Sequence, residues 1–221
     1  MFAIAESQGR PIQQGTQDWL YLRQFYITGT RAHQLLSSDK TRATLLRNML
    51  KAYDKPSNEA PYTSERLDKA HTDEKMAVNR FAFMHDVEPK HTDDFLLSNS
   101  YRFAALSPDI VIYAGEKVDF TVEIKCLDAD NHLSVMTSDE IDKPYHSQVE
   151  WEIFITGARY GLYYGFCPEL ERLADYKKII SMTDKRRAEI EKIYLDFEEK
   201  LISLFNQYGI NYEQPAIHLS Y

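Results

Sequence analysis

The chain has 221 residues, of which 43% are hydrophobic and 27% are charged, and this size and composition are typical of one soluble globular domain. No apolar run approaches the ~18 residues that a membrane-spanning helix requires, which excludes an integral membrane protein and predicts a single domain over residues 1–221. The formal net charge of −8 argues against a broad basic surface, so binding of nucleic acid requires positive charge concentrated in a pocket or channel.

The amino terminus and the cysteines bear on the compartment and on metal binding. Residues 1–8 lack the basic region and the long apolar segment of a secretory signal, so we expect a cytoplasmic protein. Cys126 and Cys167 have no metal-type spacing. We therefore expect two buried, reduced thiols and neither a disulfide, a zinc site nor an iron–sulfur cluster.

The first 84 residues predict helices, because capping residues are followed by apolar residues at helical spacing. The predicted helices cover residues 16–23, 28–36, 39–53 and 63–84, with Thr16 as the cap of the first and Asp39 as the cap of the third. Residues 55–61, with two prolines, predict a loop inside the domain.

Strands dominate the middle of the chain. The predicted strands cover residues 95–97, 101–106, 110–113, 118–125, 160–166 and 176–182, and the predicted helices cover residues 144–155 and the segment that Thr183 caps. In the hairpin around Gly115, the second strand alternates apolar and polar residues, which predicts one core face and one charged face carrying Glu123 and Lys125. A polar connection follows this hairpin. The pattern predicts an α/β (α+β) fold with a central mixed sheet flanked by helices.

One segment carries the residues that phosphodiester chemistry needs. Ser107-Pro108-Asp109 precedes Glu123-Ile124-Lys125, and Glu123 and Lys125 project from the same side of a strand. Hydrolysis of a phosphodiester uses carboxylate oxygens to hold Mg²⁺, together with a nearby cation that orients the attacking water. Asp109 and Glu123 supply the oxygens, and Lys125 supplies the cation.

The register of this hairpin is a test of the hypothesis. A four-residue turn at 114–117 would place Asp109 opposite Val122, so that its side chain would face away from Glu123. We therefore predict a β-bulge between Asp109 and Glu123, which restores a shared face. The alternative is an ordinary exposed strand whose outward residues happen to be charged.

Two further polar residues interrupt apolar helix faces. Glu74 lies in the apolar stripe of the helix at 63–84, where it is either a solvated residue at the edge of the stripe or a third acid at the metal site. Gln148 shares a helix face with Trp151 and Ile155. It either contacts DNA or water at the site or caps a buried backbone group.

The order of these motifs resembles a known family. The string from Gln14 to Arg23, followed by Ile27-Thr28-Gly29-Thr30, closely resembles the opening signature of the lambda exonuclease (YqaJ-like) family of viral recombinases. Further matches follow in the family's order and at similar spacing: Glu74 with Ala77 and Val87, Ser107-Pro108-Asp109, Glu123-Ile124-Lys125-Cys126, and residues 145–149 with Gln148. They extend from residue 14 to about residue 167.

The resemblance implies a restriction-endonuclease-like core and a role for each residue. Asp109, Glu123 and the backbone carbonyl of Ile124 would hold Mg²⁺, as two ions for which Mn²⁺ can substitute, and Lys125 would position water. Glu74 and Gln148 would complete the site. Arg23 would bind the terminal 5′ phosphate with help from Thr30 and Ser107, since a planar guanidinium matches phosphate oxygens; the alternative for Arg23 is a solvated charge on a helix surface.

The implied activity is 5′-to-3′ digestion of one strand of linear duplex DNA from a phosphorylated end. Mononucleotides would be released, and a 3′ single strand would remain for recombination. The resemblance also implies a toroidal homotrimer, a single-strand annealing protein as partner, and a phage or prophage protein in the bacterial cytoplasm. The alternatives are an endonuclease on the same core and a non-catalytic protein that binds DNA ends; an endonuclease would cut circular DNA.

Overall fold

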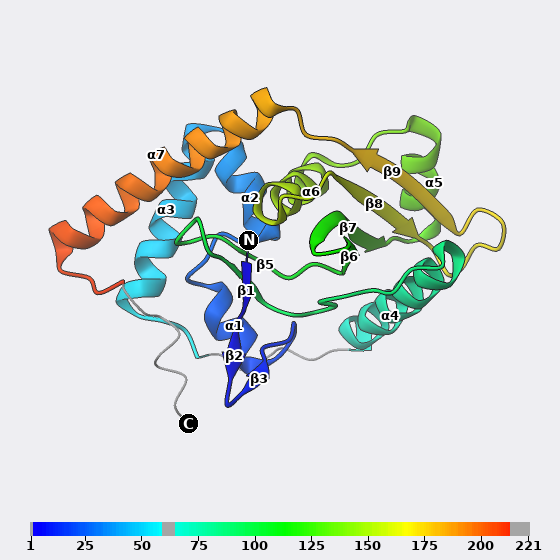
Figure 1. The fold of residues 1–221 in the computed structure, drawn as a ribbon, viewed down its shortest axis with the longest axis horizontal. Helices are drawn as coiled ribbons and strands as arrows, with labels where there is room; N and C mark the ends of the chain where they lie inside the picture. The colour runs from blue at the N-terminus through cyan, green and yellow to red at the C-terminus, as the bar shows by residue number, and fades with distance from the viewer. Residues whose placement is uncertain (1, 59–64, 213–221) are drawn as a thin grey trace.

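The computed structural model describes residues 2–58 and 65–212, and a four-stranded mixed sheet organises its second half (Figure 1). The strand order is β6-β7-β8-β9. The strands are β6 (Ile110–Ala114), β7 (Lys117–Cys126), β8 (Tyr160–Phe166) and β9 (Asp175–Ile180). β7 and β8 pair in parallel, whereas β6 with β7 and β8 with β9 pair antiparallel. β7 is therefore an inner strand.

Helices cover both faces of this sheet. On one face, α4 (Glu65–His85) packs Ala77 and Phe81 against apolar residues of β6, β7 and β8. On the other, α6 (Lys143–Thr156) packs Val149 and Ile153 against the sheet. Gly161 of β8 permits this close contact, since a Cβ there would lie 2.4 Å from Val149 Cγ1. The polar side of β7 is consequently covered by α6.

A second layer of helices packs beside the sheet and shares α6 with it. It contains α2 (Gly29–Leu36), α3 (Asp39–Asp54) and α7 (Asp184–Tyr208). Buried residues of these helices, among them Leu35, Leu45 and Leu201, form one cluster with Trp151 of α6. This layer packs against the side of α6 that carries Trp151. The side of α6 that carries Val149 and Ile153 is thereby held against the sheet.

The remaining elements are short. They are β1 (Phe2–Ile4), β2 (Glu6–Ser7), β3 (Arg10–Pro11), α1 (Gln17–Arg23), β4 (Leu96–Ser98), β5 (Ala105–Leu106) and α5 (Ala129–Ser138). β1 pairs with β4, and β4 with β5, so the amino terminus lies against the segment that leads into β6. Within the described ranges, no helix combines the length and the apolar content needed to cross a bilayer.

The structure confirms the predicted fold class and most element positions. Thr16 and Thr183 cap α1 and α7 by accepting hydrogen bonds from backbone N–H groups of Trp19 and Arg186. The cap assigned to Asp39 is wrong: Ser38 accepts the capping bond, and Asp39 is the first helical residue. Residues 59–64, which include part of the predicted loop and the predicted start of α4, lie outside the described residues.

Three further predictions are corrected. The polar connection after β7 contains the helix α5, which Asp128 caps. Of the strand predicted at 101–106, only Ala105–Leu106 pairs as a strand. The thiols of Cys126 and Cys167 are both free, but only that of Cys167 is fully buried.

Candidate active site

The hairpin of β6 and β7 contains the predicted bulge. Ala114 pairs with Lys117 and Tyr113 with Val118, but Ile112 pairs with Phe120, so the register shifts by one residue. The shifted register runs on to Ile110 opposite Val122. Because cross-strand partners share a face, Asp109, one residue before β6, is brought to the side of Glu123. This prediction is confirmed.

Asp109, Glu123 and Lys125 form a compact polar group. The side chains of Asp109 and Glu123 are buried, so the alternative of an ordinary exposed strand face does not hold for Glu123. The backbone N–H of Ile124 donates to Asp109 Oδ2 at 2.6 Å, and Lys125 Nζ donates to Glu123 Oε1. The polar alternation of β7 thus marks a covered site at the interface with α6.

The charges of this group are strongly coupled. Burial, with the nearby carboxylates of Glu123 and Glu74, raises the pKa of Asp109 well above its usual value. Burial acts to lower the pKa of Lys125, but the adjacent carboxylates of Glu123 and Asp109 outweigh it and raise that pKa above its ordinary value. Lys125 therefore remains a cation, and Asp109 binds a proton more readily than an exposed aspartate does.

Glu74 and Gln148 come to this group from the helices on the two faces of the sheet. Both are half-buried and line a pocket of about 270 Å³ together with Asp109, Glu123 and Lys125. Burial raises the pKa of Glu74, while hydrogen bonding to Asp109 acts in the opposite direction. Gly29, the first residue of α2, gives Gln148 its space, because a Cβ there would lie 2.8 Å from Gln148 Cγ.

Arg23 also lines this pocket. It is half-buried on α1, and its Nη2 donates to Thr30 Oγ1 at 3.0 Å. Burial lowers its pKa from the usual value of 12.5, but a guanidinium keeps its charge. In the described ranges, no carboxylate lies within ion-pair distance of Arg23. Ser107 lines the pocket as well.

One pocket thus contains two acids with a lysine, together with an arginine and the hydroxyl groups of Thr30 and Ser107. The model of the YqaJ-like viral recombinase domain matches residues 18–159. The chain belongs to this family. Among curated proteins, none matches the chain.

Solved structures share the fold of this YqaJ-like chain. An alkaline exonuclease (LHK-Exo) from Laribacter hongkongensis is 16% identical, with a TM-score of 0.71 over 88% of this chain and 96% of that chain. Its complex with dAMP is also 16% identical, with a TM-score of 0.68 over 88% and 98%. A phage-related exonuclease from Haemophilus somnus 129PT is 10% identical, with a TM-score of 0.59 over 90% and 97%.

All of the side chains predicted for the YqaJ-like site line this pocket. They are Arg23, Thr30, Glu74, Ser107, Asp109, Glu123, Lys125 and Gln148, with Ile124 between the last acid and the lysine. Trp19 also lines the pocket, and Glu152 is buried on α6, although neither was predicted as a site residue. Burial and the neighbouring Glu123 carboxylate raise the pKa of Glu152 well above its usual value. Its position four residues after Gln148, within a run of buried residues, was the available signal.

The donor set of the YqaJ-like site fits Mg²⁺. Among the described residues, no group of three His, Cys, Asp or Glu side chains is arranged to hold a metal ion by itself. However, Mg²⁺ is commonly bound through one or two carboxylates, with water and substrate phosphate as the other ligands. Glu123 Oε2 is buried and has no hydrogen-bond partner in the described part of the chain. This oxygen, with Asp109 and the carbonyl of Ile124, is suited to a hard cation.

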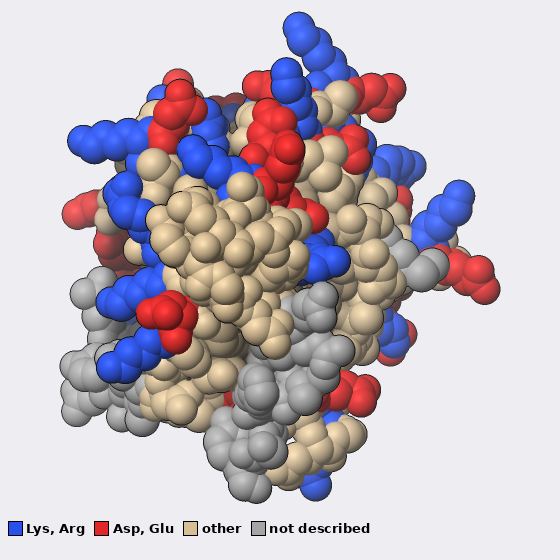
Figure 2. Space-filling view, turned by 90° about the vertical axis from the view of Figure 1, so that its left-hand side faces the viewer, with Lys and Arg blue, Asp and Glu red and all other residues tan. Residues whose placement is uncertain are grey.

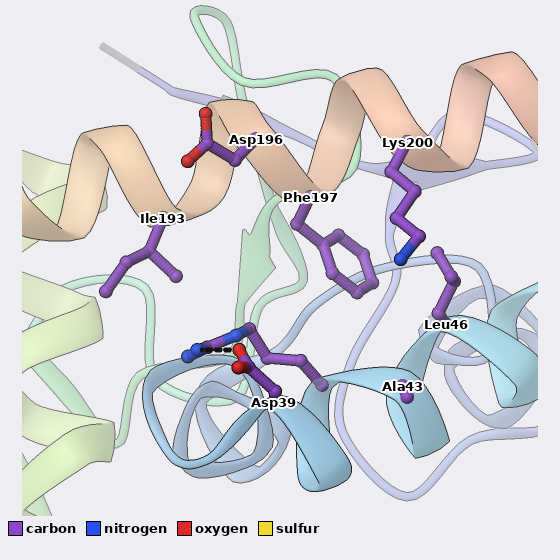
Figure 3. A pocket seen from close by; sticks show the side chains of 8 residues that line it. Asp39, Ala43, Leu46, Ile193, Asp196, Phe197 and Lys200 are labelled. Carbon is purple, nitrogen blue, oxygen red and sulfur yellow. Dashed lines mark hydrogen bonds and ion pairs between the residues drawn. The ribbon is translucent and has the colours of Figure 1, made fainter.

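A second hollow, between α3 and α7, lacks comparable chemistry. It measures about 290 Å³, and its lining combines apolar residues with a few charged ones. In this hollow Asp39 accepts a hydrogen bond from Arg42 at 2.6 Å, and the side chain of Asp196 points away from Asp39 (Figure 3). Among the described residues that line this hollow there is no acidic pair with a lysine, so the pocket at β7 is the candidate active site.

Proposed function

We propose that this protein is a Mg²⁺-dependent exonuclease that digests one strand of linear duplex DNA from a 5′-phosphorylated end. One observation carries the proposal: a single pocket is lined both by a buried acidic pair with its lysine and by an arginine that has no carboxylate within ion-pair distance in the described ranges. The acidic pair with its lysine has the chemistry needed to hydrolyse the scissile phosphodiester. The arginine has the chemistry needed to bind the phosphate at the end of the strand.

Each side chain has a role in this proposal. Asp109, Glu123 and the carbonyl of Ile124 would hold Mg²⁺, as two ions for which Mn²⁺ can substitute. When bound, the metal would neutralise phosphate charge and lower the pKa of water. Lys125 would orient the attacking water, and Glu74 and Gln148 would hydrogen-bond to it or to the phosphate. Arg23, Thr30 and Ser107 would bind the 5′ phosphate.

Family membership supports three further parts of the proposal. The neighbour LHK-Exo is an alkaline exonuclease seen with dAMP, and we accordingly propose that the products here are mononucleotides. We also propose a ring of three chains around the duplex and an annealing protein that receives the 3′ single strand. Light scattering of the purified protein would give the mass of the ring, and a dimer or monomer at working concentration would contradict it.

The decisive experiment uses a linear duplex with a 5′ phosphate on one strand and a different label on each strand. We expect Mg²⁺-dependent loss of the phosphorylated strand by the wild type, none by Lys125→Ala, and full activity for the exposed control Lys192→Ala. Cutting of a covalently closed circle would instead indicate an endonuclease. Tight binding of ends without digestion, with Mg²⁺ or Mn²⁺, would indicate a protein that only binds ends.

A further inference from the structure

Trp19 contacts both Arg23 and Ser107, two of the residues that we propose bind the end phosphate. The centre of the Arg23 guanidinium lies 4.1 Å above the Trp19 ring centroid, and the indole Nε1–H donates to Ser107 Oγ at 2.8 Å. Trp19 and Arg23 are four residues apart on α1, so both side chains project from one side of the helix. Ser107 is 88 residues away, in the segment before β6. One side chain therefore touches both groups.

The hydrogen bond to Ser107 determines what the serine can do. An indole N–H is a donor and never an acceptor, so Ser107 must accept from it. Within the described part of the chain, Ser107 has no other hydrogen bond, and its own hydroxyl hydrogen is left to donate elsewhere. The pocket is the space beside it. Trp19 thereby turns Ser107 into a donor toward the pocket.

The ring also fixes the arginine. A guanidinium stacked on an aromatic face keeps its N–H groups in the plane, where they are available to planar acceptors. One of these groups, at Nη2, donates to Thr30 Oγ1, and Thr28 Oγ1 lies 3.2 Å from the same oxygen. Arg31 lies close enough that its pKa is lowered to about 10, first by burial and then by the charge of Arg23. Two neighbouring cations without a carboxylate in the described ranges favour an anion.

We infer that Trp19 is the positioning residue for recognition of the end phosphate, acting through Arg23 and Ser107 at once. The inference rests on the proposed function, since it concerns the same pocket. It assigns to the indole two separable contributions: the ring face orients Arg23, and the N–H orients Ser107. Loss of Trp19 should therefore lower discrimination between phosphorylated and unphosphorylated ends without touching the acidic pair.

The test measures binding of two duplexes that differ only in a 5′ phosphate or a 5′ hydroxyl, in EDTA so that no cleavage occurs. The readout is the ratio of the two Kd values, which a merely structural role would leave unchanged. We expect Trp19→Leu to reduce this ratio at least about fivefold and Trp19→Phe, which keeps a ring but loses the N–H, to reduce it about twofold. Tyr21→Leu, an aromatic replacement on the same helix outside the pocket, should leave the ratio unchanged.

Double variants separate the two contributions. When Arg23→Ala and Ser107→Ala are both present, adding Trp19→Leu should not reduce the Kd ratio further. When Ser107→Ala alone is present, adding Trp19→Phe should not reduce the ratio further. A Trp19→Leu protein with the wild-type ratio, when Arg23→Ala has lost it, would overturn the inference and leave the proposed function standing. A wild type without any preference for the phosphate would overturn the proposed end recognition, and the role of Trp19 with it. If Trp19→Leu fails to fold, the Trp19→Phe and Ser107→Ala pair gives the same decision.

Discussion

The contact between Lys125 and Glu123 bears on both the stability and the activity of the protein. Asp109 and Glu123 are carboxyl groups in a place that water hardly reaches, and burial of a charge without a partner is unfavourable. The ammonium of Lys125 offsets part of this cost by donating to Glu123. The same ammonium lines the pocket, where we propose that it orients the attacking water. A substitution of Lys125 therefore changes stability as well as activity, and the two effects must be measured separately.

Lys125→Met keeps much of the side-chain length but removes the charge. We expect nuclease activity to fall at least about 100-fold, the range of one positioned acid–base group. The melting temperature of the metal-free variant should fall more at pH 8 than at pH 5, because burial raises the pKa values of Asp109 and Glu152, and these two groups take up protons as the pH falls. Calorimetry at both pH values would measure this. An equal fall at the two pH values would contradict the assigned electrostatics.

Gly29 offers a test of Gln148 that leaves Gln148 in place. An alanine Cβ at position 29 would approach Gln148 Cγ to 2.8 Å and Nε2 to 3.2 Å, so the glutamine must rotate away from the pocket. Activity should fall about 10-fold, as expected for a misplaced catalytic contact. The melting temperature should change by only about 3 °C, since alanine favours the helix by up to ~1 kcal/mol. A Gly29→Ala, Gln148→Ala double variant that is slower than Gln148→Ala alone would refute this account.

At the scale of elements, the position of α6 depends on an ion pair as well as on packing. Arg186 of α7 donates two hydrogen bonds to Glu150, at 2.7 and 2.8 Å. His146 lies 3.7 Å from Glu150 Oε2, and Arg186 also contacts Glu189 at 3.1 Å. Burial acts to raise the pKa of Glu150, but Arg186 and His146 outweigh it and lower this pKa to about 2. α7 thus holds the helix that carries Gln148 and Glu152.

The pH dependence of stability follows from that pKa. Since the carboxyl group of Glu150 has a lower pKa folded than unfolded, where it is about 4.5, its contribution is present above pH ~4.5 and is lost as the pH falls toward 2. The shift corresponds to about 3 kcal/mol at most. Glu150→Gln should lower the free energy of unfolding by about 1–3 kcal/mol at pH 7 and flatten its decline between pH 5 and 2. Urea titrations would show this, and the exposed Glu199→Gln should behave as the wild type.

Periodicity and capping predicted the elements well, because both are local properties of the chain. Examples are the helix caps at Thr16 and Thr183 and the alternation of apolar and polar residues in β7. The bulge could also be predicted, since the hypothesis that Asp109 and Glu123 share a site required a one-residue shift of register. Burial of the polar side of β7 could not, because it depends on α6, which the chain reaches only after a connection and a further helix.

The site was predicted unevenly for the same reason. Motif order indicated the residues that contact the pocket, but Glu152 was missed because its partner Glu123 lies on another element. Trp19 was seen as part of a signature and not as a side chain with two contacts. Contacts between distant segments, such as Trp19 with Ser107, depend on the assembled fold and have no pattern in the local sequence.

At the scale of the whole molecule, the distribution of charge constrains how DNA is bound. The formal net charge is −8. On the face in Figure 2, which includes α3 and the carboxyl-terminal part of α7, basic and acidic side chains stand side by side around an uncharged area. A field of one sign therefore does not extend over this face. The pocket, by contrast, contains Arg23 and Lys125, with Arg31 close behind Arg23.

Binding should consequently depend on an end of the duplex and not on its length. We compare an open 30-base-pair duplex carrying 5′ phosphates with a dumbbell of the same stem, closed by hairpins, using Ca²⁺ in place of Mg²⁺ to limit cleavage. The open duplex should bind at least about 10-fold more tightly, since only it delivers a terminal phosphate to Arg23. Each neutralised phosphate contributes about −0.9 to the slope of log K against log salt, so the two pocket cations together with Arg31 predict a slope near −3 per chain. Equal binding of the dumbbell, with a slope beyond about −6, would show that a basic surface elsewhere binds the duplex and would overturn this account of how an acidic protein engages DNA.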